Sequence, residues 1–176
     1  AATETPTPSL AATFTGDATG ATDVTAELTE FLESHDGERV ALAADGVYQV
    51  TRVAFTATDL TVDFRGARLK GTLVGARGIL VLVDGSDVTL NDPMVFGTGY
   101  EWREEDQNEH GIHVDGGSGI VLNRPVTRDT RGDGIYVGFN EGRTSPATGV
   151  VINEPDIERA ARNGIAPVAG EVSIIG

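Results

Sequence analysis

The chain has 176 residues, enough for one folded domain with a substantial hydrophobic core. It contains no cysteine, so disulfides and thiol chemistry are excluded. With 27 acidic and 13 basic residues, the formal net charge is −14, which opposes binding to nucleic acid or to an anionic membrane. No stretch approaches the roughly 20 apolar residues of a membrane span.

The first 19 residues are predicted to form a disordered or extended segment. Residues 1–9 (AATETPTPS) are small, polar and rich in proline, a composition that cannot bury a core. We interpret this segment as the start of a mature exported protein whose signal peptide has been removed. The predicted location is therefore secreted or on the cell surface.

Residues 20–37 are predicted to contain a helix that caps one end of the fold. Asp23 is placed to cap its start, and His35 is expected to bond the last helix carbonyls. The apolar residues form one stripe: Val24, Leu28, Phe31 and Leu32. An amphipathic helix laid across the first coil of a repeat protein blocks further strand pairing there.

From residue 38 to residue 176, short β patterns return with altered side chains. One pattern occurs as DVTLNDPMV, GIVLNRPVT and GVVINEPDI, at residues 87–95, 119–127 and 149–157. Its central Leu or Ile residues lie 32 and 30 residues apart. A second pattern, HGIHV, DGIYV and NGIA, starts at residues 110, 133 and 163. Self-similarity at this period is typical of a solenoid built from stacked coils.

The Asn-x-Pro in each repeat predicts the corner of a coil. Asn tolerates the left-handed backbone conformation of a sharp bend, and its amide can bond its neighbours. One Asn per coil would give a buried amide ladder of Asn91, Asn123 and Asn153. Because proline lacks the N–H donor, we place Pro93, Pro125 and Pro155 at strand starts. The alternative is three unrelated turns in a β-sandwich.

The cycle of Gly-Ile-x-Val, a short turn and Val-x-Leu-Asn-x-Pro resembles the right-handed parallel β-helix of the pectate-lyase-like superfamily. The helix at 20–34, followed by the strand at 39–50 with its Gly-x-Tyr-x-Val ending, is similar to the entry segment of many members. The resemblance covers about residues 20–176. It implies an all-β, right-handed parallel β-helix with an N-terminal capping helix. It leaves the reaction open, because the superfamily holds lyases, hydrolases, epimerases, esterases and non-catalytic adhesins.

Residues 169–176 (AGEVSIIG) repeat the β pattern once more and stop before an Asn turn. We therefore expect the β-helix to be incomplete at this end, with an uncapped last coil. An exposed apolar edge invites pairing, so further chain or a second subunit is expected to complete this coil.

The Gly-Ile-x-Val strands bring polar residues to one place. With their neighbours pointing inward, His113 and Tyr136 point outward on adjacent strands about 5 Å apart. His110 and Asp133 occupy equivalent positions just before these strands, and Asp115 lies at the far end of the first. The sequence therefore predicts one polar patch on the outer face.

Two insertions flank this patch and are predicted to form the walls of a groove. Residues 97–109 include Tyr100, Trp102 and Arg103, and residues 138–147 form the second loop. In superfamily members with polysaccharide substrates, the cleft lies on the strand that Gly-Ile-x-Val resembles. Aromatic faces stack on sugar rings, and Arg binds hydroxyl and carboxylate groups, so these residues are candidate substrate ligands.

Three chemistries are open to the patch. A lyase or epimerase needs an acid, a base and a neutraliser of the sugar carboxylate. Its candidates are His113 and Tyr136, assisted by His110 and Asp133, with Arg128 or Arg131 as neutraliser. A glycoside hydrolase would use the carboxylates of Asp115 and Asp133. A Ca²⁺ site would use Asp115, Asp129 and Asp133.

We predict an extracellular protein that acts on a polysaccharide, foremost a lyase or epimerase of an acidic glycan. The alternatives are a glycoside hydrolase of the same fold and a non-catalytic carbohydrate-binding, adhesin or structural module. The chain lacks the tight Asp-Asp and Asp-x-x-Asp motifs of β-helix hydrolases and calcium-dependent lyases. The aspartates before glycine, Asp115 and Asp133, also fit ordinary turns.

Overall fold

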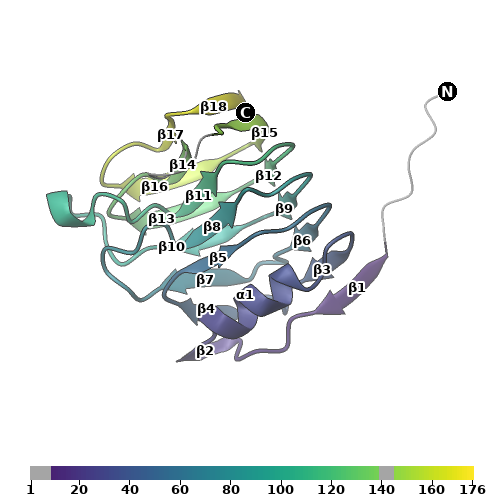
Figure 1. The fold of residues 1–176 in the computed structure, drawn as a ribbon. Helices are drawn as coiled ribbons and strands as arrows, with labels where there is room; N and C mark the ends of the chain where they lie inside the picture. Colours follow the sequence, from purple (N-terminus) through teal and green to yellow (C-terminus); the bar gives the residue numbers. More distant parts are fainter. Residues whose placement is uncertain (1–8, 139–144) are drawn as a thin grey trace.

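The computed structural model describes residues 9–138 and 145–176 and is a parallel β-helix (Figure 1). Each full coil contributes one short strand to each of three parallel sheets, which we call sheets A, B and C. Sheet A contains β1 (Leu10–Thr13), β3 (Arg39–Ala41), β6 (Thr61–Asp63), β9 (Thr89–Asn91), β12 (Val121–Asn123), β15 (Ala147–Asn153) and β18 (Gly170–Ile175).

Sheets B and C follow sheet A around each coil. Sheet B contains β2 (Thr19–Asp23), β4 (Val47–Val50), β7 (Arg68–Gly71), β10 (Met94–Phe96), β13 (Val126–Thr130) and β16 (Asp156–Ala160). Sheet C contains β5 (Val53–Phe55), β8 (Leu80–Val83), β11 (Ile112–Asp115), β14 (Ile135–Gly138) and β17 (Ile165–Pro167). The predicted solenoid of stacked coils is confirmed.

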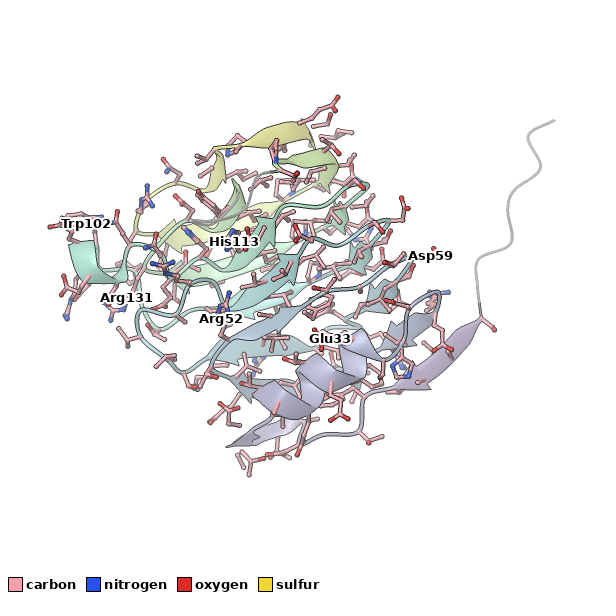
Figure 2. The ribbon with its side chains drawn as sticks, in the orientation of Figure 1. Glu33, Arg52, Asp59, Trp102, His113 and Arg131 are labelled. Carbon is pink, nitrogen blue, oxygen red and sulfur yellow. The ribbon has the colours of Figure 1, made fainter. Side chains whose placement is uncertain are left out.

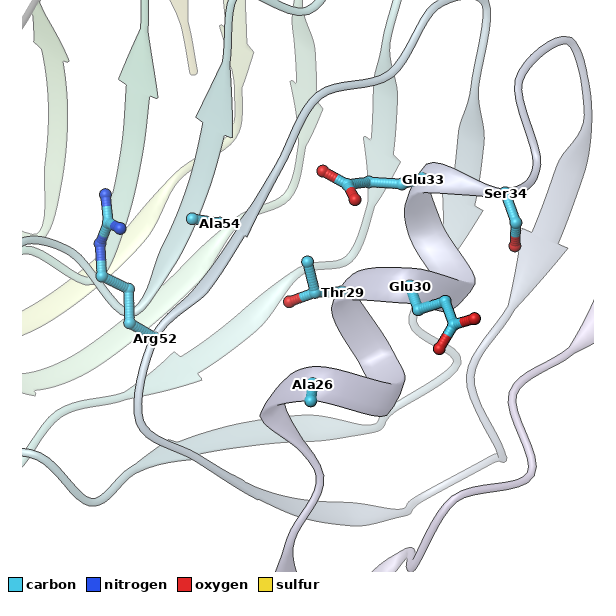
Figure 3. A pocket seen from close by; sticks show the side chains of 7 residues that line it. All are labelled: Ala26, Thr29, Glu30, Glu33, Ser34, Arg52 and Ala54. Carbon is cyan, nitrogen blue, oxygen red and sulfur yellow. The ribbon is translucent and has the colours of Figure 1, made fainter.

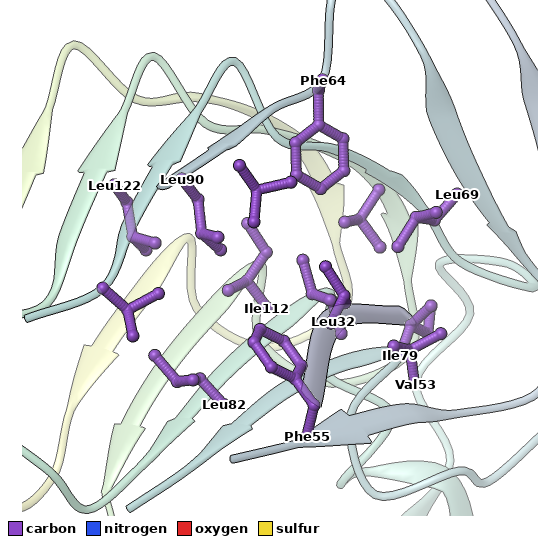
Figure 4. Close-up of a cluster of buried hydrophobic side chains, with 14 of the residues drawn as sticks. Leu32, Val53, Phe55, Phe64, Leu69, Ile79, Leu82, Leu90, Ile112 and Leu122 are labelled. Atoms are coloured by element: carbon purple, nitrogen blue, oxygen red, sulfur yellow. The ribbon is translucent and has the colours of Figure 1, made fainter. Parts of the chain in front are cut away.

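The core runs along the inside of the coils, where equivalent apolar residues stack on one another (Figure 4). Leu90 and Leu122 face inward from sheet A and pair in register, and Leu82 is in the same core on sheet C. All three side chains are buried. Because successive residues of a strand point to opposite faces, the residues on either side of each inward position are free for the surface.

The helix α1 (Thr25–Glu33) stands in the first coil where later coils have a strand of sheet C, and it packs against β5 (Figure 1). It is shorter than the predicted range, and the preceding residues form β1 and β2. Its predicted apolar stripe is confirmed, with Leu28 and Leu32 buried. The N-cap position belongs to Val24 instead of the predicted Asp23, although the Asp23 carboxylate accepts a hydrogen bond from the Thr25 N–H at 2.9 Å. The His35 ring nitrogen Nδ1 lies 2.6 Å from the Phe31 carbonyl, as predicted.

The predicted Asn ladder is confirmed, and it is longer than expected. Asn153 donates to Asn123 at 2.7 Å, and Asn123 donates to Asn91 at 2.8 Å. Asn91 donates to the carboxylate of Asp63, which also accepts from Arg39 at 2.7 Å. The ladder lies on the outer face of sheet A and is only partly buried, because the inward positions belong to the neighbouring Leu and Ile residues.

The left-handed residue of each corner is not the Asn, which corrects the sequence interpretation. The positive φ angles belong to the next residue, at 54° for Asp92, 49° for Arg124 and 49° for Glu154. The Asn itself stays in the strand, where its amide can reach the next coil. The prolines precede their strands as predicted, since β10 starts one residue after Pro93 and β13 one residue after Pro125.

Replacing Asn123 with alanine is expected to destabilise the protein by about 1–2 kcal/mol, because a donor and an acceptor on two neighbouring rungs lose their partners. Partial exposure keeps the cost below that of a buried ladder, since water reaches both groups. Urea unfolding measures the loss, with Asn108→Ala as the control at an exposed asparagine. An equal loss in the two variants would contradict a stabilising role for the ladder.

The outer edge of β18 pairs with no other strand in the part of the chain that the structure describes. Ile174 and Ile175 are exposed there, as is Val168 just after β17. The expectation that further chain or a second subunit covers this edge stays a prediction. Among the described residues, no helix has the length and apolar character needed to cross a membrane.

Candidate functional site on sheet C

The outer face of sheet C holds the polar patch that the sequence predicted. Strand β11 pairs in register with β14, which sets His113 opposite Tyr136. Their neighbours Ile112 and Val114 belong to the core, so the two polar side chains lie on the other face of the sheet. The predicted outward placement of His113 and Tyr136 is confirmed.

Three aromatic rings of this patch contact one another. The His110 and Tyr136 rings are stacked, with centroids 4.4 Å apart and planes tilted by 13°. The His113 ring meets Tyr136 edge-on at 4.9 Å and His110 edge-on at 5.6 Å. The same register sets His110 beside Asp133, because each lies two residues before the paired Ile positions of adjacent coils.

Asp133 holds the His110 ring from the coil above. The His110 Nδ1 atom accepts a hydrogen bond from the Asp133 backbone N–H at 3.1 Å and lies 3.2 Å from the Asp133 carboxylate. The other carboxylate oxygen accepts hydrogen bonds from the backbone and side-chain amides of Asn163, at 3.0 and 2.8 Å. Burial alone would raise the pKa of Asp133, but the adjacent His110 ring and the hydrogen bonds from Asn163 outweigh it and hold the pKa below its usual range. The carboxylate is therefore ionised at neutral pH.

The lowered pKa of Asp133 links its ionisation to stability. A carboxyl with a depressed folded-state pKa stabilises the fold above its unfolded value of about 3.9, and this contribution is lost as the pH falls through the folded-state pKa. Asp133→Asn is therefore expected to flatten the loss of stability in acid. Denaturant unfolding at a series of acidic pH values tests this, with Glu104→Gln as the exposed control. A slope unchanged by Asp133→Asn would contradict the linkage.

Tyr136 is the partly exposed member of the patch, whereas the side chains around it are buried. His113 is 1 % exposed, Asp115 2 % and His110 3 %, so the histidines lie beneath the surface instead of lining an open groove. Burial raises the pKa of the Tyr136 phenol, and the carboxylates of Asp133 and Asp115 raise it further, against a lowering by Arg162. The phenol therefore stays protonated at neutral pH and can donate a proton.

The loop at residues 97–109 is held against the coils by a buried carboxylate, that of Glu109. It accepts hydrogen bonds from the N–H and hydroxyl of Thr98, at 2.8–2.9 Å, and from the N–H of Gly75 at 3.1 Å. Arg131 lies beside it, 4.0 Å from Glu109 and 3.6 Å from Asp106, and donates to Thr98. Arg131 therefore anchors this loop instead of reaching into the patch.

The aromatic residues of this loop are exposed. Trp102 is 59 % exposed and Tyr100 is 56 % exposed, next to the short 3-10 helix η1 (Glu104–Asp106). Figure 2 shows Trp102 far out on the projecting loop, Arg131 nearer its base and His113 on the body of the β-helix. Arg103 is also exposed and faces Glu101 at 3.7 Å. Residues 139–144 of the predicted second wall of the groove lie outside the described residues.

Two predicted residues lie away from the patch. Arg128 is on the outer face of sheet B and pairs with Asp156 at 2.6 Å and Glu158 at 3.3 Å. Asp129 accepts two hydrogen bonds from Arg159, at 2.6 and 2.9 Å. The expected calcium ligands Asp115, Asp129 and Asp133 do not assemble, and no group of three or more His, Asp or Glu side chains within residues 9–138 and 145–176 is arranged to hold a metal ion.

Sequence reasoning missed the partners that the next coil supplies to the patch. Arg162 approaches the Asp133 carboxylate at 3.6 Å, and Asn163 donates to it. The repeat contained the signal, because Asn163-Gly-Ile aligns with Asp133-Gly-Ile, as the pairing of Ile135 with Ile165 shows. Because Asn163 is not a typical catalytic residue, the alignment did not indicate its role as a hydrogen-bond donor to Asp133.

An open cleft lies beside α1, apart from the patch (Figure 3). Arg52 borders it on one side and Glu33 on the other, and the small side chains of Ala26, Thr29 and Ala54 lie between them. The Arg52 side chain is fixed by a hydrogen bond from its Nε to the Arg77 carbonyl at 3.0 Å. Ala54 pairs in register with Val81, which in turn pairs with His113, so the cleft lies two strands from the patch on the same sheet.

Comparison with protein-family models, with curated proteins and with solved structures finds no match for this chain. The fold and the patch describe the protein as a parallel β-helix in which the buried pair of Asp133 and His110 lies against the partly exposed Tyr136.

Proposed function

We propose that the chain acts on an acidic polysaccharide by proton transfer, as a lyase or an epimerase. The observation that carries the proposal is the stacking of the protonated Tyr136 phenol on the His110 ring, whose Nδ1 faces the ionised Asp133. In the His110 tautomer that carries its proton on Nδ1, toward the Asp133 carboxylate, the lone pair is on Nε2, which can act as a base. The neutral phenol beside the ring supplies an acid.

Both reactions begin with removal of the proton on the carbon next to the sugar carboxylate. In elimination, the freed electron pair forms a carbon–carbon double bond as the bond to the leaving oxygen breaks, and the acid protonates that oxygen. In epimerisation, the carbon regains a proton on its opposite face. We assign the base to His110 and the acid to Tyr136. His113, edge-on to the phenol and more deeply buried, is assigned the positioning of Tyr136.

Negative charge grows on the sugar carboxylate during proton removal, and a nearby cation stabilises it. Arg128 and Arg131 are held in ion pairs outside the patch. Arg162 is the better candidate, because it lies near Tyr136 and Asp133 and its side chain is 32 % exposed. Its Nη1 donates to the Gln107 carbonyl at 3.3 Å, and its 3.6 Å approach to Asp133 is longer than a hydrogen bond, so the guanidinium keeps other donors to offer.

The resemblance to the pectate-lyase-like superfamily supports this proposal, because that superfamily includes lyases and epimerases. Membership in it, and a secreted or cell-surface location, are part of the proposal. The hydrolase alternative is weaker, because the ionised Asp133 is already engaged with His110 and Asn163 and lacks the proton that a general acid needs.

A non-catalytic glycan-binding module is the second candidate. The near-complete burial of both histidines and the exposure of Trp102 and Tyr100 favour it. Exposed aromatic rings can stack on sugars without any proton transfer. In this case Trp102 would contribute to affinity and the patch on sheet C would be structural.

Incubation with a panel of polyuronates in deuterated water separates these functions. A lyase produces an ultraviolet-absorbing double bond, and an epimerase places deuterium on the carbon next to the carboxylate, which nuclear magnetic resonance detects. A polyuronate that binds without either change would reject the proton-transfer proposal in favour of the binding module. Turnover retained in full by Tyr136→Phe would reject the assigned acid.

A further inference from the structure

Within residues 9–138 and 145–176, the cations that lack an acidic partner are confined to one part of the fold. Among residues 9–138 and 145–176, the later arginines and Arg39 each approach a carboxylate within 4.0 Å. The described cations without such an ion pair all lie between residues 52 and 77: Arg52, Arg65, Arg68, Lys70 and Arg77. In a chain with a net charge of −14, this separation leaves a local region of uncompensated positive charge.

Two of these cations stand side by side on the outer face of sheet B. On β7, Arg68 and Lys70 are exposed and alternate with the buried Leu69. Their registered neighbours are Val47 and Gln49 on β4, and Met94 and Phe96 on β10. None of these neighbours is acidic. The face is therefore positively charged, flanked by neutral side chains, and built on strands that lie side by side in Figure 1.

The face also offers an aromatic ring. The Arg68 guanidinium lies 6.0 Å from the centre of the Phe96 ring, a cation–π arrangement that orders the arginine. Arg128 lies beside Phe96 on the next strand, β13, but its guanidinium is held by Asp156 and Glu158. Alternate residues of one strand are about 6.6 Å apart, so Arg68 and Lys70 are spaced to meet neighbouring anionic groups.

We propose that the outer face of sheet B around Arg68 and Lys70 binds the carboxylate or sulfate groups of an acidic glycan. The inference rests on the proposed function for its class of ligand, but it concerns a surface separate from the patch on sheet C. The net charge of the chain repels a polyanion at most of its surface. At Arg68 and Lys70 an anionic group meets cations without displacing a carboxylate. A glycan held there would remain near the protein while its other residues sample sheet C.

Charge also decides between classes of anionic polymer. Double-stranded nucleic acid carries one negative charge per about 1.7 Å of helix axis, which increases its repulsion from an acidic protein. A polyuronate carries one charge per sugar and presents sugar faces that can contact Phe96 and Met94. The geometry therefore favours the glycan.

Binding of a polyuronate to the full chain tests the proposal. All proteins carry Tyr136→Phe, so that binding is measured without turnover, by titration calorimetry. Arg68→Gln with Lys70→Gln is expected to weaken binding roughly tenfold, the combined effect of two exposed charge pairs. The matched control, Arg124→Gln with Arg159→Gln, changes the net charge equally at cations that already have acidic partners. The control is expected to bind as tightly as the parent protein. Both double variants are expected to unfold at the same thermal midpoint as the parent.

Further ligands identify the group that is recognised. A sulfated glycan should lose affinity in the Arg68 and Lys70 variant as the polyuronate does, and a methyl-esterified polyuronate should bind weakly to every variant. Equal losses in the test and control variants, no loss in either, or tighter binding of single-stranded DNA than of any glycan would overturn the proposal. Binding through Arg68 and Lys70 without turnover by the unmodified chain would reject the catalytic function and leave this surface intact.

Discussion

Replacing Tyr136 with phenylalanine is expected to lower turnover of an acidic glycan by about 10²–10⁴-fold while leaving the fold and glycan affinity unchanged. The substitution removes only the hydroxyl and keeps the ring that stacks on His110 and meets His113 edge-on. The lost proton donor, not a packing defect, would then account for the result. Steady-state kinetics give the turnover, and denaturant unfolding gives the stability.

Tyr100→Phe is the matched control, because it removes the same hydroxyl from an exposed tyrosine of the projecting loop. Its turnover should equal that of the parent chain. His110→Gln should also lose turnover, because glutamine can hydrogen-bond but cannot cycle a proton at neutral pH. An equal loss in Tyr136→Phe and Tyr100→Phe would show that the phenol of Tyr136 is not the acid.

The pH profile supplies a second check on Tyr136. Because burial and nearby carboxylates raise the pKa of this phenol, its proton remains in place beyond the ordinary tyrosine value of about 10. Loss of the acid should therefore limit the rate only at strongly alkaline pH. A rate that falls between neutrality and mild alkalinity would point to a different acid.

The fold was largely predictable because two different sequence patterns repeat in every coil from residue 110 onward. The spacing of the Asn-x-Pro phrases predicted the coils, and alternation within Gly-Ile-x-Val predicted which residues face out. The sequence could not reveal which residue of Asn-x-Pro is left-handed, because Asp92 and Asn91 both tolerate that conformation. The strand register decides this, since Asn91 must stay extended to reach Asn123.

The candidate site was predictable only in part, because the sequence did not show how deeply its histidines are buried. In-register stacking was enough to bring His110, His113, Asp133 and Tyr136 together. It could not show that the histidines are covered, because that depends on how segments before and after the strands fold over the sheet. Gly78, for instance, has a φ angle of 81°, and a side-chain carbon added to it would lie 3.0 Å from the Cβ of His113. The backbone of that turn therefore presses against the histidine.

Replacing Glu109 with alanine is expected to have the largest effect on stability, a loss of about 3–5 kcal/mol, because removing one member of a buried charged network leaves its partners uncompensated. The Glu109 side chain is fully buried, and its carboxylate receives the N–H groups of Thr98 and Gly75 beside the Arg131 guanidinium. Alanine would leave these donors without an acceptor and a cation without its partner.

The same carboxylate joins two loops from successive coils, so its loss should also be local. Hydrogen exchange at the amides of Thr98 and Gly75 is expected to accelerate more than exchange in the Asn ladder on sheet A. In Glu109→Gln, one acceptor oxygen remains and the other is replaced by an NH2 donor that faces the same N–H groups. The stability of this variant should therefore fall between that of Glu109→Ala and that of the parent protein. Glu105→Ala, at an exposed glutamate of the same loop, should change stability by less than about 0.5 kcal/mol. If Glu109→Ala proved equally mild, the projecting loop with Trp102 would not depend on this carboxylate, and another contact would have to hold it beside sheet C.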